Sequence, residues 1–394
     1  MSLQLAHRHY ALPFRVPVRT SHGPWAVREG LVVRVKDETG AVGYGEVAPV
    51  PHFGTETANE AAAALQALGG RIDETQIDAL PDRLSCTRHG LRAALANCRA
   101  GSPAVSLSNR PNPAASGLSP ELEADPPVAA VYDRRTGPAT SLGGHRPPLQ
   151  NTVETERDFA RSICAPLPVA ALLPAGREAL AAVSSKVELG FRAFKWKVGV
   201  GDNDEELGLL DDLLARMPGG ARLRLDANGA WDRRRAERWL ERCAERPVEF
   251  VEQPIAPTMR GADDLLLGLA SDHPTPLALD ESLVRDGDVE RWLASGWPGL
   301  FVVKPALLAD PAAICARLAR AQAGVVFSSA LETAVGAQSA LRLAFAWPGE
   351  RRALGFGVYP LFTDARFDGP PVAPFVSVED VAQLNPEDVW NALN

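Results

Sequence analysis

The sequence contains few of the residues that mark secreted, zinc-thiolate or membrane proteins. Its 394 residues include 5 cysteines, which are scattered and show no Cys-x-x-Cys spacing. Neither a disulfide framework nor a zinc site is therefore predicted. The first 14 residues lack the apolar core of a signal peptide, and no apolar run approaches the length of a transmembrane helix. We expect a cytoplasmic protein that does not enter a membrane.

Basic residues are also fewer than acidic residues. Lysine and arginine total 41 against 49 aspartates and glutamates, which gives a net charge of −8. The one basic run, residues 233–235, lies in a predicted helix with acidic neighbours. This balance argues against a nucleic-acid partner. The chain is 46% hydrophobic and 23% charged, and its length suits a soluble enzyme of two domains.

Residues 1–100 predict a small α+β domain. Two antiparallel strands joined at 37–40 are followed by helical patterns at 58–70 and 89–101. The segments 19–25 and 49–55 combine glycine, proline and aromatic residues, as loops that cover a cleft often do. Ordinary surface loops are the alternative.

Residues 101–156 predict a flexible insertion or linker. Proline, glycine and serine fill 20 of the 50 positions from 101 to 150. Such a composition buries too little apolar surface to form a core. We expect no catalytic residue there.

Residues 157–358 carry a repeating pattern of apolar strands that end in a charged residue. Their charged ends are Lys197, Asp226, Glu252, Asp280 and Lys304, separated by 29, 26, 28 and 24 residues. Each interval accommodates one strand and one helix, as in a TIM-like barrel, where strand ends converge on one site. We predict the α/β class, with a (β/α)7β-type barrel, an N-terminal α+β capping domain and a tail at 359–394 that packs on the capping domain.

Two further groups of polar residues fall at predicted strand ends. Lys195 and Lys197 are two apart, so in a strand both side chains project from the same face. Ser328 and Ser329 follow a seventh strand and precede a predicted helix, whose N-terminus would suit an anionic substrate group. Hydroxyls that only cap that helix are equally compatible.

The three carboxylates would supply only oxygen ligands, which suits Mg²⁺. A metal-bound substrate carboxylate has a more acidic adjacent C–H bond. Lys197 and Lys304 could then act as base and acid, provided that both pKa values fall toward neutrality. Buried ion pairs between a lysine and a carboxylate would explain each of these residues singly. They would not explain why charged residues recur at the ends of five successive strands.

These residues resemble the enolase superfamily, within it the muconate-lactonizing subgroup and most closely the o-succinylbenzoate synthase family. The resemblance lies in motifs such as GYGEVAP, FKWKVG, LRLDAN, FVEQP, LALDES and VVKP. It implies a Mg²⁺-dependent lyase that dehydrates a small-molecule carboxylate, 2-succinyl-6-hydroxy-2,4-cyclohexadiene-1-carboxylate, to 2-succinylbenzoate for menaquinone or phylloquinone synthesis. It further implies the following roles: Lys197 as base and acid, Lys304 as its partner, Asp226, Glu252 and Asp280 as metal ligands, and Lys195, Arg224 and Asn228 as supporting residues.

Substrate contacts are expected from both domains. His22 and Phe53 of the capping loops would close over the substrate, and Phe356 would supply apolar surface. Dipeptide epimerases of the subgroup carry an Asp-x-Asp pair at the eighth strand, whereas residues 354–360 here contain no carboxylate. An N-acylamino-acid racemase or dipeptide epimerase remains the alternative, and a non-catalytic barrel is a more distant one.

Overall fold

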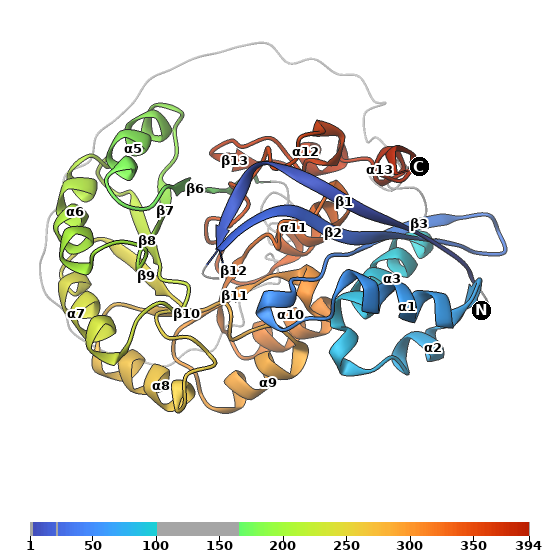
Figure 1. The fold of residues 1–394 in the computed structure, drawn as a ribbon, viewed down its shortest axis with the longest axis horizontal. Helices are drawn as coiled ribbons and strands as arrows, with labels where there is room; N and C mark the ends of the chain where they lie inside the picture. The colour runs from blue at the N-terminus through green and yellow to red at the C-terminus, as the bar shows by residue number, and fades with distance from the viewer. Residues whose placement is uncertain (1–2, 21–22, 101–164, 394) are drawn as a thin grey trace, which may run out of the picture.

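The computed structural model describes residues 3–20, 23–100 and 165–393. The predicted insertion lies outside them. Figure 1 shows a ring of strands with helices around it, beside a smaller sheet that carries its own helices. The smaller sheet has the order β3-β2-β1-β4. Its elements are β1 (Leu3–Thr20), β2 (Gly23–Lys36), β3 (Val42–Val47), β4 (Arg71–Ile72), α1 (Ala58–Leu68), α2 (Glu74–Asp78) and α3 (Ser85–Arg99).

The long strand β1 is the main element of this domain that the sequence analysis missed. It pairs with β2 along most of its length, with an irregularity between Pro13 and Val18. The prolines and basic residues hide its alternation, yet Tyr10, Leu12 and Phe14 are all buried. Within the segment 19–25, which the sequence predicted as a loop, β1 continues to Thr20 and β2 begins at Gly23, and these two residues pair.

The larger domain is built on a parallel sheet of seven strands in the order β12-β11-β10-β9-β8-β7-β6. The strands are β6 (Ala170–Leu173), β7 (Ala193–Lys197), β8 (Arg222–Asp226), β9 (Val248–Glu252), β10 (Leu277–Leu279), β11 (Leu300–Val303) and β12 (Gly324–Phe327). The helices are α5 (Glu178–Glu188), α6 (Asn203–Ala215), α7 (Arg233–Cys243), α8 (Ala262–Asp272), α9 (Asp286–Ala294), α10 (Pro311–Arg320) and α11 (Ala334–Ala346). Strands and helices alternate around the ring, as predicted (Figure 1).

Two bridge residues, rather than a full eighth strand, close the barrel. Leu354 pairs with Val169, and Gly355 pairs with Ser328. Glycine is required here because a Cβ on Gly355 would lie 2.4 Å from the hydroxyl oxygen of Ser328. The predicted fold class is confirmed. In place of the predicted eighth strand, the structure has only the two bridges formed by Leu354 and Gly355.

The C-terminal segment returns to the capping domain. It contains α12 (Val378–Ala382) and α13 (Pro386–Ala392), which lie beside the capping sheet in Figure 1. Arg8 of β1 donates a hydrogen bond to the Trp390 carbonyl, and its guanidinium lies 4.6 Å from the centre of the Trp390 ring. The tail therefore helps to hold the antiparallel sheet in place.

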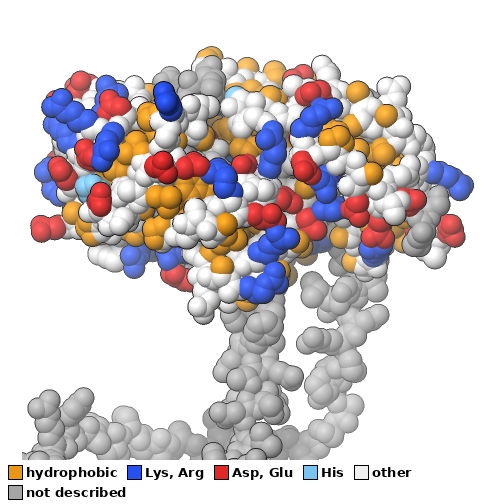
Figure 2. Space-filling model, turned by 90° about the horizontal axis from the view of Figure 1, so that it is seen from below, with side chains coloured by type: hydrophobic (Ala, Val, Ile, Leu, Met, Phe, Trp, Pro, Cys, Tyr) orange, Lys and Arg blue, Asp and Glu red, His pale blue; other side chains and the backbone are white. Residues whose placement is uncertain are grey.

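The surface carries both signs of charge. On the face in Figure 2, lysine and arginine side chains alternate with aspartate and glutamate instead of forming one basic stripe. Within the described ranges, no helix is both long and apolar enough to cross a membrane.

A buried histidine makes the stability of the fold depend on pH. Burial lowers the pKa of His89 in α3 to about 4, although a hydrogen bond to the Leu308 backbone and the charge of Asp310 oppose this shift. The unfolded chain binds this proton below about pH 6.5, whereas the folded chain does so only near pH 4. Stability is therefore lost as the pH falls between these values.

We expect His89→Met to flatten this dependence. Between pH 7.5 and pH 5, the wild type should lose about 2 kcal/mol more unfolding free energy than the variant. Urea denaturation of both proteins at the two pH values measures the difference. Parallel losses would contradict the assignment to His89.

Candidate active site

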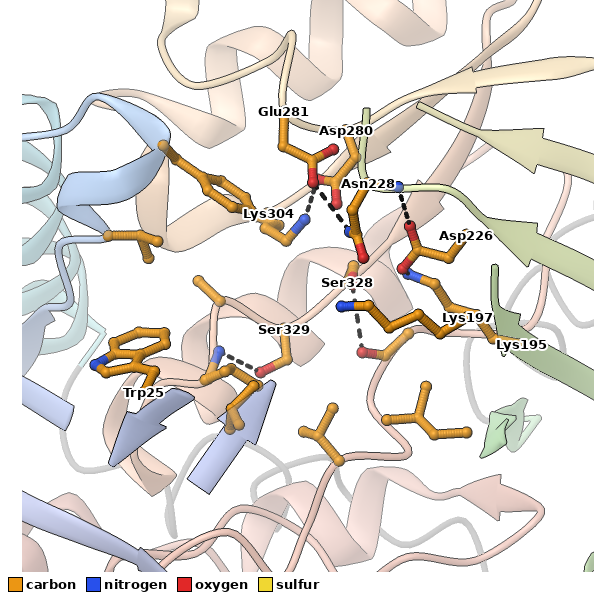
Figure 3. A pocket seen from close by; sticks show the side chains of 18 of the residues that line it. Trp25, Lys195, Lys197, Asp226, Asn228, Asp280, Glu281, Lys304, Ser328 and Ser329 are labelled. Atoms are coloured by element: carbon orange, nitrogen blue, oxygen red, sulfur yellow. Dashed lines mark hydrogen bonds and ion pairs between the residues drawn. The ribbon is translucent and has the colours of Figure 1, made fainter. Parts of the chain in front are cut away.

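A pocket opens where the C-terminal ends of the barrel strands face the capping domain. Figure 3 shows charged side chains on one side of it and Trp25 on the other. It is lined by Val18, Trp25, Val50, His52, Phe53, Leu172, Leu173, Lys195, Lys197, Asp226, Asn228, Asp280, Glu281, Lys304, Ser328, Ser329, Ala330, Leu331, Gly355 and Val358. Four of the five strand ends predicted from the sequence thus meet in one cavity, and the fifth, Glu252, is bound to the lining residue Lys195.

Strand register brings the acidic residues together. Lys197 pairs with Asp226 across β7 and β8, and Asp226 pairs with Glu252 across β8 and β9. The ammonium of Lys195 lies 2.8 Å from Oδ2 of Asp226 and 2.8 Å from Oε1 of Glu252. Lys195 therefore links two of the three predicted metal ligands.

Lys304 occupies the other side of the pocket. Its ammonium forms an ion pair with Asp280 and lies 5.3 Å from the centre of the Phe53 ring, a cation–π contact. Phe53 belongs to a short 3-10 helix of the capping domain, Pro51–Phe53. The capping domain thus contacts a catalytic candidate directly.

The two lysines differ in acidity. Burial lowers the pKa of Lys197 from its usual value, and the charge of Lys195 adds to this effect while that of Asp226 opposes it. Burial also disfavours the charged form of Lys304, but Asp280 and Glu252 outweigh it and raise its pKa. The expectation that both pKa values fall is therefore wrong for Lys304, because its carboxylate neighbours are close enough to dominate.

The carboxyl groups of the cluster lie close enough to shift one another's pKa. Burial, assisted by Asp226 and Asp280, raises the pKa of Glu252 well above its usual value, against the opposing charge of Lys195. The pKa of Asp280 is lowered: burial opposes this shift, but Lys304 dominates, and a hydrogen bond with Glu252 contributes. A cation bound between Glu252 and Asp280 would stabilise the ionised forms of both buried acids.

Two buried oxygen atoms without a hydrogen-bond partner also favour a cation site. The Asn228 amide donates to Oε1 of Glu281 at 3.0 Å, and Oδ1 of Asn228 and Oε2 of Glu281 are buried without a hydrogen-bond partner. In the described part of the chain, no three acidic, histidine or cysteine side chains already surround a single point as a metal-binding group. In this arrangement Lys195 contacts Asp226 and Glu252, and Lys304 contacts Asp280. The donor set is nevertheless all oxygen, which fits Mg²⁺.

Glu46 of the capping domain occupies the helix N-terminus that we predicted for a substrate anion. Its carboxylate accepts hydrogen bonds from the backbone N–H of Thr333 and Gly336, from the Thr333 hydroxyl at 2.6 Å and from the Tyr10 hydroxyl at 2.5 Å. A protein carboxylate therefore takes the backbone N–H groups of Thr333 and Gly336 at the start of α11, where the sequence had predicted that a substrate anion would bind.

The loop before α11 is also tied to the capping domain. The buried guanidinium of Arg28 donates to the carbonyls of Leu331 at 3.0 Å and Pro49 at 2.5 Å. Ser328 and Ser329 remain in the pocket wall, and Ser329 donates to the Glu332 carboxylate at 3.1 Å. Arg28 and Glu46 therefore fix one wall of the pocket from the neighbouring domain.

Two predicted substrate or supporting residues, Arg224 and Phe356, do not line the pocket. Arg224 is bonded to the Glu249 carboxylate and the Ala353 carbonyl, deeper in the barrel than the pocket. Phe356 points into the apolar core, and the wall is formed by its neighbours Gly355 and Val358. His22 is outside the described residues.

The sequence analysis also missed residues of the pocket wall. Glu281 could have been found, because it directly follows Asp280. Trp25 lies in a segment already marked as a possible lid. Leu172 and Leu331 gave no signal, since apolar residues are common in every strand and loop.

Family models match both domains. One described as "MenC, N-terminal domain" matches residues 4–98, and one described as "Enolase C-terminal domain-like" matches residues 178–377. Together with the barrel and its lysine and carboxylate strand ends, these matches show that the chain belongs to the enolase superfamily.

Individual relatives narrow the assignment. The chain is 36% identical to an o-succinylbenzoate synthase of Thermosynechococcus vestitus over 89% of this chain and 91% of that protein. A hydrophobic dipeptide epimerase of Roseobacter litoralis is 30% identical over 71% of this chain and 69% of that protein. The crystal structure of o-succinylbenzoate synthase from Thermosynechococcus elongatus BP-1, complexed with Mg in the active site, superimposes with a TM-score of 0.73 and 32% identity, covering 99% of this chain and 100% of that one. The chain belongs to the o-succinylbenzoate synthase family.

We expect Glu46→Gln to weaken both the fold and substrate binding. The glutamine amide has nearly the shape of the glutamate side chain, but it removes the charged acceptor from the buried donors of Thr333, Gly336 and Tyr10. The unfolding free energy, measured by urea denaturation, should fall by about 1–3 kcal/mol. KM should rise, because Thr333 and Gly336 lose their anchor on Glu46 and the pocket loop at 328–331 leads directly into this helix start.

Glu56→Gln is the matched control. Glu56 is a buried carboxylate that accepts from the backbone N–H of Thr87 at 2.7 Å, entirely within the capping domain. This variant should lose stability and keep its KM. The same KM in both variants would contradict the role given to Glu46.

Proposed function

We propose that this protein dehydrates 2-succinyl-6-hydroxy-2,4-cyclohexadiene-1-carboxylate to 2-succinylbenzoate, using one Mg²⁺ held by Asp226, Glu252 and Asp280. The observation that carries the proposal is the pair of lysines at the pocket. Lys197 has a lowered pKa, whereas Lys304 has a raised one and lies against Asp280. The proposal includes a cytoplasmic location and a role in the synthesis of menaquinone or phylloquinone.

Lys197 would perform both proton transfers. Its neutral amine removes the proton from the ring carbon that bears the carboxylate, and the resulting ammonium donates that proton to the hydroxyl on the neighbouring carbon. The hydroxyl leaves as water, the ring becomes aromatic and the amine is regenerated. A lowered pKa serves this cycle, because the neutral amine is available closer to physiological pH.

Lys304 would act as a fixed positive charge. Its raised pKa keeps it protonated while negative charge develops on the substrate carboxylate. Bound Mg²⁺ supplies a Lewis acid that makes the adjacent C–H bond more acidic. Phe53 covers the ammonium of Lys304 from the capping side and limits its access to water.

The rest of the pocket suits a ring with a flexible arm. Trp25 lies across the pocket from the charged cluster (Figure 3), and Leu172, Leu331 and Val358 add apolar surface to the pocket wall. Such a wall favours a substrate that combines one metal-binding carboxylate with a hydrocarbon ring.

The lysines can be tested by isotope exchange. Lys197→Ala should abolish exchange of the ring α-proton in deuterated water together with turnover, as monitored by NMR and by absorbance. Lys304→Arg, which keeps the charge, should retain more activity than Lys304→Ala. Exchange at the wild-type rate in Lys197→Ala would reverse the assignment.

Substrate preference separates the synthase from related isomerases. A dipeptide brings a buried ammonium, and residues 354–360 offer it no carboxylate. The kcat/KM for the cyclohexadiene carboxylate should exceed that for any dipeptide or N-succinylamino acid by at least about 100-fold, and EDTA should remove the activity. Equal or reversed preference would favour the racemase or epimerase reaction.

A further inference from the structure

Gln253 lies between two of the proposed metal ligands and is unusual in its backbone. It directly follows Glu252 at the end of β9, is fully buried and has a φ of 38°. Left-handed backbone is uncommon for a residue with a long side chain and carries a cost in free energy. Its backbone N–H donates to the Ala278 carbonyl of β10 at 2.8 Å. This conformation turns its side chain toward the end of β10.

The Gln253 side-chain amide makes four hydrogen bonds there. Oε1 accepts from the backbone N–H of Asp280 at 2.9 Å and of Ser282 at 3.1 Å. Nε2 donates to the Ile255 carbonyl at 2.9 Å and to the Ser282 hydroxyl at 2.8 Å. Both donors and both acceptor positions of the amide are used, which neither glutamate nor methionine could reproduce.

The sheet itself does not hold Asp280. The pairing of β9 with β10 ends at Glu252 and Ala278, and that of β10 with β11 ends at Leu279 and Phe301. Asp280 follows the last paired residue, so its backbone N–H bonds to Gln253 and not to a neighbouring strand. The amide therefore takes the place of a sheet hydrogen bond at this point.

We infer that Gln253 is a positioning residue that sets the separation of the Glu252 and Asp280 carboxylates, and through it the affinity for Mg²⁺. Glu252 is joined to Gln253 by a peptide bond, and Asp280 is bound to its side chain. A rigid connection holds the two carboxyl groups at a fixed separation, so that one cation can bind both. Without it, the end of β10 would be free to shift, and the two ligands would less often lie at the distance that the metal requires.

This inference rests on the proposed function, since it assumes that the carboxylates bind Mg²⁺. The test is isothermal titration of the full chain with MgCl₂, without substrate, for the wild type and Gln253→Met. The variant should bind Mg²⁺ about 10- to 100-fold more weakly, the usual effect of losing a group that orients a metal ligand. Raised Mg²⁺ should restore much of its turnover.

Gln338→Met is the matched control. Gln338 is a buried glutamine of α11 whose amide donates to the carbonyls of Val381 and Leu384 in the C-terminal segment. Its replacement should lower the melting temperature and leave the Mg²⁺ affinity unchanged. A general loss of stability would weaken Mg²⁺ binding in both variants, whereas a positioning role affects only Gln253→Met.

Each outcome can be assigned. If the wild type fails to bind Mg²⁺, the metal assignment of the proposed function fails and the inference fails with it. If the wild type binds and Gln253→Met binds equally well, only the inference is overturned. Should Gln253→Met not fold, Ser282→Ala removes one of the four bonds and should weaken Mg²⁺ binding several-fold; unchanged affinity there overturns the inference.

Discussion

The double ion pair of Lys195 is the contact on which the arrangement of the pocket depends. Its ammonium lies 2.8 Å from the carboxylates of both Asp226 and Glu252. Buried carboxylates on adjacent strands repel each other, and a shared cation offsets that repulsion. Lys197, its neighbour on the same strand face, has its pKa lowered chiefly by burial, and the charge of Lys195 adds to that effect. Lys195 thus organises the acids and contributes to the lowered pKa of Lys197.

The capping domain is a structural part of the site as well as a cover. Glu46 and Arg28 bind the loop that carries Ser328 and Ser329, while Phe53 contacts Lys304. Hydrogen bonds between the domains are buried, so separating them would leave charged groups unsatisfied. A pocket wall held in this way keeps its shape before substrate arrives, which reduces the entropy that binding must overcome.

Much of the barrel could be predicted because it repeats. Strand ends at a regular interval identified Lys197, Asp226, Glu252, Asp280 and Lys304, and all but Glu252 line the pocket, with Glu252 bound to Lys195 beside it. Irregular elements escaped prediction. Prolines obscured β1, and Arg224 shares the inward face of β8 but lies too deep to reach the cavity. The periodicity of a sequence predicts the face of the strand from which a side chain projects. It does not predict how far that side chain lies from the pocket.

The sequence by itself determined the barrel, the order of its charged strand ends and the oxygen-only character of the ligand set, because these follow from local periodicity and residue type. Only the tertiary structure decided that Lys304 is held protonated, that Glu46 occupies the N-terminus of α11 and that Gln253 bonds to Asp280. The physical reason is the same in each case. Electrostatic and hydrogen-bond energies depend on distances between groups far apart in the chain, and those distances exist only after the domains have packed.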